Sequence, residues 1–335
     1  MKIFVYEYIT GGGLWREAPE TAPAGSLLRE GAAMVRAIIG DLSAIESVEV
    51  VALLDERLSG FSFDGCRWHA IGSGEQEQAM LHELAASSDY TLLIAPEIGG
   101  ALFTRCQEVE SAGGQLLGPS ADYVAIASDK HATAERLRAA GVPAAEGVRL
   151  RVGDAVPPDF SLPAVLKPCR GAGSQGVRRI DRPQQLSEAV PTISEDHRLE
   201  TYVPGLAASA AVLSGPGGSV ALPACRQWLS DDGRFRYLGG SLPLDDALDR
   251  RARVLAEAAV RAIGLPRGYV GVDLVLGDAE HGSQDVVIEV NPRLTTSYIG
   301  LRRATRENLA EALLDIARGA DRPLSFSGQE VRFRA

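Results

Sequence analysis

The sequence predicts a chain that combines an α/β unit with two α+β units. Residues 1–120 alternate strand and helix patterns, which is typical of a parallel sheet covered by helices. After Gly141-Val142-Pro143 the pattern changes to short strands separated by turns, and later a long amphipathic helix precedes two more strands. A chain of 335 residues is also too long for one small core. We therefore expect three units, which cover residues 1–120, 121–204 and 205–335.

The first unit is expected to hold a small parallel sheet. Its helix over 26–42 has apolar residues at helical spacing, Leu28, Val35 and Ile38 among them. The other expected elements are strands over 2–8, 48–54, 90–95 and 115–117 and helices over 75–86 and 102–111. Parallel sheets bind ligands at the carboxyl ends of their strands, which here are residues 7–13, 55–56 and 96–100.

The rest of the chain is expected to mix strands and helices. A helix over 121–140 ends at the stop signal Gly141-Val142-Pro143. The second unit should then contain strands over 164–167, 177–180 and 199–203 and a helix over 184–190. The third should contain a strand over 209–213, an arginine-rich stretch 226–244, a helix over 246–263, strands over 269–276 and 285–290, and a helix over 307–318.

Composition excludes several classes of function. The net charge of −10 argues against a broad basic surface for nucleic acid. No apolar run approaches the roughly 20 residues of a membrane span, and the N-terminus lacks the pattern of a signal peptide. The four cysteines have no metal-type spacing. We expect a cytoplasmic protein that binds small molecules, and neither nucleic acid nor a membrane.

Lysine is rare in this chain. Only Lys2, Lys130 and Lys167 are lysines among 34 basic residues, and the others are arginines. A compact ammonium fits among crowded phosphate oxygens better than the broad guanidinium fork does. The alternative is that these lysines occur by chance in an arginine-rich composition. The residues around each lysine must decide between a phosphate site and chance.

A glycine-rich loop follows Lys167 by four residues. It matches G-x-G-x-x-G, but a β-type run follows it where a dinucleotide-binding loop would open a helix. A loop between two strands can instead act as a flap whose backbone N–H groups close over phosphates. A plain glycine-rich hairpin is the alternative. The loop consists of Gly171, Ala172, Gly173, Ser174, Gln175 and Gly176.

Two acids interrupt otherwise apolar strands near the end of the chain. Asp273 lies on one strand and Glu289 on the next, and Asn291 shares a face with Glu289. Buried acids cost several kcal/mol unless they are paired or bind a cation. If the two strands are antiparallel neighbours, these oxygens form a hard site that suits Mg²⁺. Acids paired with arginines are the alternative.

Together these motifs resemble the ATP-grasp superfamily over about residues 120–320. The resemblance implies that Lys130 and Lys167 hold the phosphates of ATP and that Asp273, Glu289 and Asn291 hold one or two Mg²⁺ ions, with Mn²⁺ as a substitute. Lys167 and Arg293 would be catalytic, and the first unit would be a pre-ATP-grasp domain. The family's adenine hinge is matched by Glu200, Thr201, Tyr202 and Val203, followed by Pro204-Gly205.

One departure from the family concerns the ribose. Many members carry an acid soon after the hinge glycine, whereas this chain has Leu206-Ala207-Ala208. The ribose contact is therefore left open.

Three segments look like a subgroup that contains the tyramine–glutamate ligases of methanofuran and methylofuran biosynthesis. They are residues 6–13, 205–209 and 291–298. This resemblance implies an amide bond between L-glutamate and tyramine or a similar amine, formed through an acylphosphate with release of ADP and phosphate. The candidate substrate-binding residues are Glu7, Gly11, Gly12, Gly13, Thr295, Thr296 and Ser297, with Tyr298 beside them.

Several alternatives stay open at this stage. The chain could act as an ATP-grasp ligase or kinase on another amino acid, a peptide or a carrier protein, or as a nucleotide-binding regulator without turnover. Glu7 and its glycines could instead form only a tight loop with a solvated acid. The sequence does not choose the amine, the α- or γ-carboxylate, the catalytic base or whether the chain is a homodimer.

Overall fold

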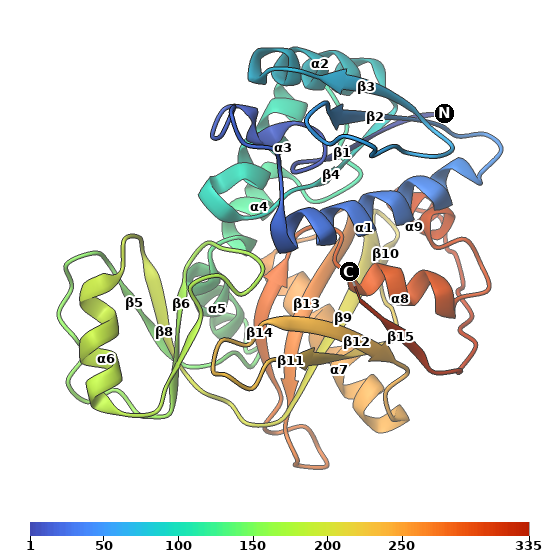
Figure 1. Cartoon of the computed structure of the whole chain (residues 1–335). Coiled ribbons are helices and arrows are strands. Elements are labelled where there is room, and N and C mark those ends of the chain that lie inside the picture. The colour runs from blue at the N-terminus through green and yellow to red at the C-terminus, as the bar shows by residue number, and fades with distance from the viewer. Residues whose placement is uncertain (335) are drawn as a thin grey trace.

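A computed structural model describes residues 1–334, in which three sheets form three neighbouring units (Figure 1). The first sheet is parallel, as expected, with the order β3-β2-β1-β4. Its strands are β1 (Lys2–Glu7), β2 (Glu49–Asp55), β3 (Arg67–Ile71) and β4 (Tyr90–Ile94).

Alternating residues of β1 serve the two faces of this sheet. Ile3 and Val5 pack against α1 (Gly25–Ser43) on one face, while Phe4 and Tyr6 face the side of α2 (Gly74–Ser87) and α3 (Ala101–Ser111). Helix α1 also packs against two helices of the last unit, so it lies between the first sheet and the rest of the molecule (Figure 1). Short 3₁₀ turns span Gly13–Trp15, Ile98–Gly100 and Val190–Thr192.

The helix expected over 121–140 is two helices. Helix α4 (Ala121–Ala127) ends before Ser128, and Asp129 caps the start of α5 (Lys130–Ala139) by accepting from the N–H groups of His131 and Ala132. The break places Lys130 at the first turn of α5 and not within a continuous helix.

The second sheet is antiparallel, with the order β5-β8-β6-β7, and α6 (Pro183–Ala189) packs near its edge strand β7. Strands β6 and β7 form a hairpin around the glycine-rich loop, so the predicted loop between two strands is confirmed. The strands are β5 (Gly147–Leu150), β6 (Ala164–Pro168), β7 (Arg178–Ile180) and β8 (His197–Thr201).

The third sheet has the order β14-β13-β9-β11-β12-β15, with β10 paired to β9. Helix α7 (Asp246–Ile263) packs on β9 and β13 and buries Ala252, Ala256 and Val260. Two further helices are α8 (Ser297–Ala304) and α9 (Leu309–Ala317). The strands are β9 (Leu206–Gly215), β10 (Gly218–Ala221), β11 (Cys225–Leu229), β12 (Tyr237–Leu242), β13 (Gly268–Leu276), β14 (Val286–Asn291) and β15 (Val331–Phe333).

Some elements differ from the sequence predictions. The expected strand over 115–117 is wrong, because only Leu116 makes a single bridge to Thr91. The arginine-rich stretch 226–244 contains two strands, and Ser297 starts a helix that the pattern did not indicate. Among residues 1–334, no helix has the length and apolar character that crossing a bilayer requires.

Candidate active site

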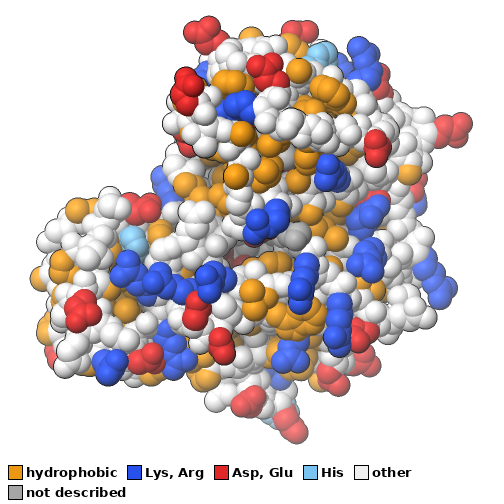
Figure 2. Space-filling model, in the orientation of Figure 1, with side chains coloured by type: hydrophobic (Ala, Val, Ile, Leu, Met, Phe, Trp, Pro, Cys, Tyr) orange, Lys and Arg blue, Asp and Glu red, His pale blue; other side chains and the backbone are white. Residues whose placement is uncertain are grey.

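The three units meet around a cavity of about 530 Å³. Figure 2 shows a hollow in this face between the N-terminal unit and the two units below it, with basic side chains gathered along its edges. The cavity is lined by most of the residues that the sequence singled out: Lys130, Lys167, Gly171, Ala172, Gly173, Ser174, Gln175, Glu200, Thr201, Tyr202, Val203, Asp273, Glu289, Asn291, Arg293, Thr295, Thr296 and Ser297.

The two lysines of the cavity are both buried and both engaged with carboxylates. Lys130 Nζ lies 2.9 Å from Glu289 Oε1 and donates to the carbonyl of Gly171 at 2.8 Å. Lys167 Nζ lies 2.5 Å from Glu200 Oε1 and donates to the carbonyl of Ile288. Burial works against the Lys130 ammonium, but Glu289 outweighs it and raises the pKa of the lysine. The Lys130 ammonium therefore stays charged at neutral pH, as phosphate binding requires.

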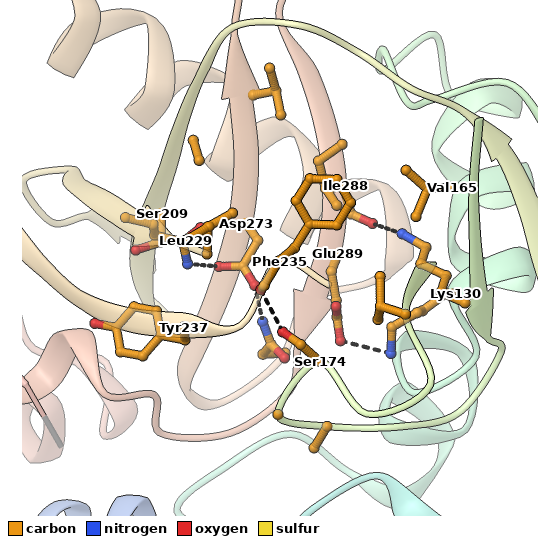
Figure 3. Close-up of a pocket in the computed structure, with 18 of the residues that line it drawn as sticks. Lys130, Val165, Ser174, Ser209, Leu229, Phe235, Tyr237, Asp273, Ile288 and Glu289 are labelled. Atoms are coloured by element: carbon orange, nitrogen blue, oxygen red, sulfur yellow. Dashed lines mark hydrogen bonds and ion pairs between the residues drawn. The ribbon is translucent and has the colours of Figure 1, made fainter. Parts of the chain in front are cut away.

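The acids of β13 and β14 lie side by side. Asp273 pairs directly with Glu289 across the antiparallel ladder, so the expected pairing of the two strands is confirmed. Asn291 donates to Asp273 Oδ2 at 3.1 Å, and Gln227 of β11 donates to Oδ1 at 2.8 Å. Burial raises the pKa of Asp273 to about 6, and the Glu289 charge adds to the rise. Figure 3 shows Glu289 between Asp273 and Lys130, so its partner is a lysine and not an arginine.

The glycine-rich loop is held against the β11–β12 hairpin. Ser174 donates to the carbonyl of Phe235 at 2.8 Å, and the N–H of Arg179 donates to the carbonyl of Gly233 (Figure 3 draws the first). Gly173 and Gly176 have φ of 64° and 72°, a region that side chains disfavour. The loop can therefore turn sharply beside the cavity, which residues 171–175 line.

The hinge segment connects β8 to β9 along the wall of the cavity. Glu200 accepts from Arg198 Nε at 2.8 Å as well as contacting Lys167, so its carboxylate holds the lysine in place. Within residues 1–334, the N–H of Val203 meets no acceptor, which leaves it free for a ligand. Gly205 has a φ of 148°, and a Cβ there would lie 2.5 Å from the carbonyl of Leu276. Only glycine lets the chain pass so close to β13.

Arg293 reaches across to the N-terminal unit. Its Nε and Nη2 lie 2.9 and 3.0 Å from the two carboxylate oxygens of Glu97, and the side chains are 13% and 2% exposed. A two-point pair of this kind fixes the plane of the guanidinium. Glu97 follows β4, at one of the strand ends where the sequence placed a ligand site.

Comparison with known proteins identifies the family. A family model described as an ATP-grasp domain matches residues 127–297, about half of the chain, and a pre-ATP-grasp domain model matches residues 48–124. The chain belongs to the ATP-grasp family. It is accordingly an enzyme of the carboxylate–amine ligase type, and ATP-grasp enzymes bind ATP with Mg²⁺.

Individual relatives cover nearly the whole chain. A tyramine–L-glutamate ligase of Methanocaldococcus fervens is 24% identical over 98% of both chains. An ATP-grasp superfamily protein of Archaeoglobus fulgidus superposes with a TM-score of 0.69 at 23% identity, over 96% of this chain and 89% of that one. A biotin carboxylase domain of Hydrogenobacter thermophilus, solved with ADP and magnesium, has a TM-score of 0.68 at 18% identity, over 95% and 69%. The structural matches show the fold.

In this ATP-grasp protein, the residues that follow β14 lie partly in the wall of the cavity and partly in the hydrophobic core. Thr295 and Ser297 line the cavity, and their hydroxyls lie within 3.0 Å of the Tyr269 hydroxyl. Tyr298 is fully buried and donates to Asp41 of α1 at 2.6 Å. The expectation that Tyr298 binds substrate is therefore wrong, because its hydroxyl ties α8 to α1.

The structure does not bring Glu7 and its glycines into the cavity. The Glu7 carboxylate is buried and accepts from the N–H groups of Ile9 and Thr10. Burial raises its pKa to about 7 despite these bonds. A Cβ on Gly11, Gly12 or Gly13 would collide with the carbonyl of Glu7, with Ile71 or with Tyr8, respectively. In this ATP-grasp protein the segment shapes the loop after β1. The tight-loop alternative describes the glycines, but the Glu7 acid is buried and not solvated.

The cavity residues that the sequence analysis did not identify include Glu30, Met34, Gln227 and Tyr237. Gln227 and Tyr237 lie on the two strands that the arginine-rich stretch concealed. Glu30 and Met34 lie on α1, at i and i+4, and therefore share one face of the helix. A search for polar or bulky residues one turn apart on the buried side of α1 could have found them.

Proposed function

We propose that the protein joins the carboxylate of an amino acid, L-glutamate, to a primary amine of the tyramine type, through an acylphosphate and with release of ADP and phosphate. The observation that carries the proposal is the convergence of two buried lysines and two partly buried acids on one cavity. The full-length similarity to a tyramine–L-glutamate ligase supports the choice of substrates.

The nucleotide would lie between the second and third units. Lys130, Lys167 and the backbone of residues 171–176 would hold its phosphates, and the free N–H of Val203 offers a donor to adenine. Backbone donors and ammonium groups fixed in advance need little reorganisation when charge moves during phosphoryl transfer. The ribose has no acid near the hinge glycine, so its contacts stay open.

The residues present fit a magnesium ion. Among residues 1–334, no three His, Cys, Asp or Glu side chains are grouped as a metal site, but Mg²⁺ favours one or two carboxylates completed by phosphate and water. Asp273, Glu289 and the amide oxygen of Asn291 would hold it. The ion would neutralise charge on the β- and γ-phosphates.

The two chemical steps would use the same site. A carboxylate oxygen of the amino acid attacks the γ-phosphorus, and the bond from that phosphorus to the oxygen of ADP breaks. The amine nitrogen then attacks the acyl carbon, and phosphate leaves. Arg293 would stabilise the charge on the acyl oxygen and on the transferring phosphoryl group, while the loop 171–176 would exclude water from the acylphosphate.

ADP release is expected only when an acid and an amine are both present. A coupled assay with L-glutamate and a panel of amines, tyramine included, measures this directly. Rapid release with the acid alone would indicate a kinase and contradict the ligase proposal. Binding of ATP without turnover under every combination would indicate a regulator.

Glu289→Gln is expected to raise the Mg²⁺ concentration needed for half-maximal turnover by at least about tenfold. The change removes one negative ligand and also the partner of Lys130. Magnesium titrations at saturating ATP provide the measurement. Glu280→Gln, an exposed acid in the turn between β13 and β14, is the matched control. An unchanged magnesium dependence in Glu289→Gln would remove this residue from the metal site.

A further inference from the structure

Helix α1 supplies an acid to the cavity from the N-terminal unit. Glu30 lines the cavity, and Met34 lies one turn later on the same face. Met34 and Tyr237 belong to the same apolar cluster and both line the cavity. A carboxylate beside an apolar wall is a suitable environment for a cation that carries an apolar body.

The contact between α1 and the buried Glu7 carboxylate fixes the orientation of the helix. A Cβ on Gly31 would lie 2.4 Å from Glu7 Oε1, so the helix backbone rests directly on the buried Glu7 carboxylate. Residue 31 therefore faces β1, and residue 30 must point along another side of the helix, toward the cavity. Glu7 contributes to the site in this way without entering it.

The Glu30 carboxylate has no protein partner. Within the described chain, residues 1–334, it accepts no hydrogen bond and enters no ion pair, although it is partly buried. Burial raises its pKa, and the positive charges of Arg293 and Arg29 oppose the rise. The other titratable group that faces it is Tyr237 on β12. A partly buried acid without a partner is costly unless a ligand supplies the opposite charge.

We propose that Glu30 binds the ammonium group of the amine substrate and is the base that takes its proton. This inference rests on the proposed ligase function. It assigns the amine subsite to the space between Glu30, Met34 and Tyr237, and its ligand to primary amines with an apolar body. Arg293, whose charge acts on Glu30, also lines the cavity, so the amine would enter beside the activated acyl group.

The proton balance follows from this placement. The ammonium gives one proton to Glu30, and the neutral nitrogen attacks the acyl carbon. The C–N bond forms, and the C–O bond to phosphate breaks with its electron pair left on phosphate. The nitrogen's second proton goes to the departing phosphate, and Glu30 returns its own proton to water when the product leaves.

Glu30→Gln tests the inference when two nucleophiles are compared. Hydroxylamine is uncharged at neutral pH and traps an acylphosphate without needing a base. With ATP and L-glutamate, the variant is expected to form hydroxamate within about threefold of the wild-type rate, whereas kcat/KM for tyramine falls by about a hundredfold or more. The tyramine rate of the variant should also rise about tenfold per pH unit toward the pKa of the amine, while the wild type levels off.

The other outcomes are equally informative. Equal losses with both nucleophiles would overturn the amine role, because they would mean that Glu30 acts on acyl activation or on folding. An unchanged tyramine rate would overturn it as well. Absence of hydroxamate from the wild type with any amino acid would defeat the proposed ligase function and this inference with it. Glu46→Gln, an exposed acid just beyond α1, controls for the lost charge, and hydroxamate formation itself reports that Glu30→Gln is folded.

Discussion

Lys167→Ala is expected to lower kcat by about 10²–10³-fold, the cost typical of removing one fixed group that stabilises a developing charge. The Lys167 ammonium ends the strand that leads into the glycine-rich loop and lies at the wall of the cavity. It is 2.5 Å from Glu200 and donates to the carbonyl of Ile288, which leaves one donor for a phosphate. The proposed reaction passes negative charge through this region in both steps.

The change also removes a buried ion pair, which must be separated from catalysis. Glu200 keeps Arg198 as a partner at 2.8 Å, so the variant does not leave its carboxylate without compensation. We therefore expect the protein to fold and to bind ATP more weakly. Thermal unfolding and nucleotide binding report on these two properties separately from turnover.

Lys2→Ala is the matched control, because Lys2 does not line the cavity and its ammonium donates to Ser87 on α2. Wild-type turnover in Lys167→Ala, with normal stability, would exclude this lysine from the phosphate site. A loss confined to stability would assign it a structural role with Glu200.

The sequence predicted those parts of the site that lie on one local motif. Asp273 and Glu289 were expected to be neighbours because strand residues alternate and because two acids in apolar strands need a shared environment. The ladder confirms it, with Asp273 opposite Glu289. The hairpin around residues 171–176 was predictable for a similar reason, since strand patterns flank the loop on both sides.

Elements that depend on distant partners were less predictable. Strand β3 buries only Ile71 fully, because it lies at the edge of its sheet, so its apolar pattern is weak. Strands β11 and β12 pair within a hairpin, but they carry one arginine and two glycines and are completed by β9 and β15. The break before Lys130 was present in the sequence as Ser128-Asp129, a good capping pair, but an uninterrupted helical pattern on both sides concealed it.

The residues that the N-terminal unit contributes to the cavity could be predicted only from knowledge of how the units pack. Glu30 is one of many acids on amphipathic helices, and the one local signal is its place one turn from Met34 on the buried side of α1. Its role becomes visible because α1 lies between the first sheet and the cavity, resting on Glu7 through Gly31. Glu7 was singled out for its place at a strand end, which was sound, but the chain turns away there and the acid bonds to its own loop.

The pair between Arg293 and Glu97 leads to the second large expected effect. Arg293→Lys is expected to lower kcat by about 10²–10³-fold while binding of ATP changes by much less. A lysine keeps the charge but cannot make the two parallel bonds to Glu97 that fix the guanidinium plane. The charge would then be mobile at the point where the acyl oxygen and the phosphoryl group need a fixed donor.

A purely structural tie between the N-terminal and C-terminal units would give a different pattern. Breaking a buried pair by deleting one partner costs about 3–5 kcal/mol, because the other charge is left uncompensated. Arg293→Ala and Glu97→Ala should therefore both lower the unfolding temperature, whatever the chemistry. The unfolding temperatures of these two variants measure how much the pair between Arg293 and Glu97 stabilises the protein. The rates of the other variants are compared with this loss of stability.

Glu97→Gln separates the two roles, because it keeps the shape of the acid and one acceptor for the guanidinium while removing the charge. If Arg293 acts on the reacting groups, Glu97→Gln should lose part of kcat with little change in KM for ATP, and Arg293→Lys should lose more than Glu97→Gln at equal thermal stability. Equal rates in the two variants, or rates that follow the unfolding temperature alone, would mean that Arg293 only holds the N-terminal and C-terminal units together and does not act on the reacting groups. The expected order, wild type above Glu97→Gln above Arg293→Lys, follows from a guanidinium that works only when its plane is held toward the acyl group by the N-terminal unit.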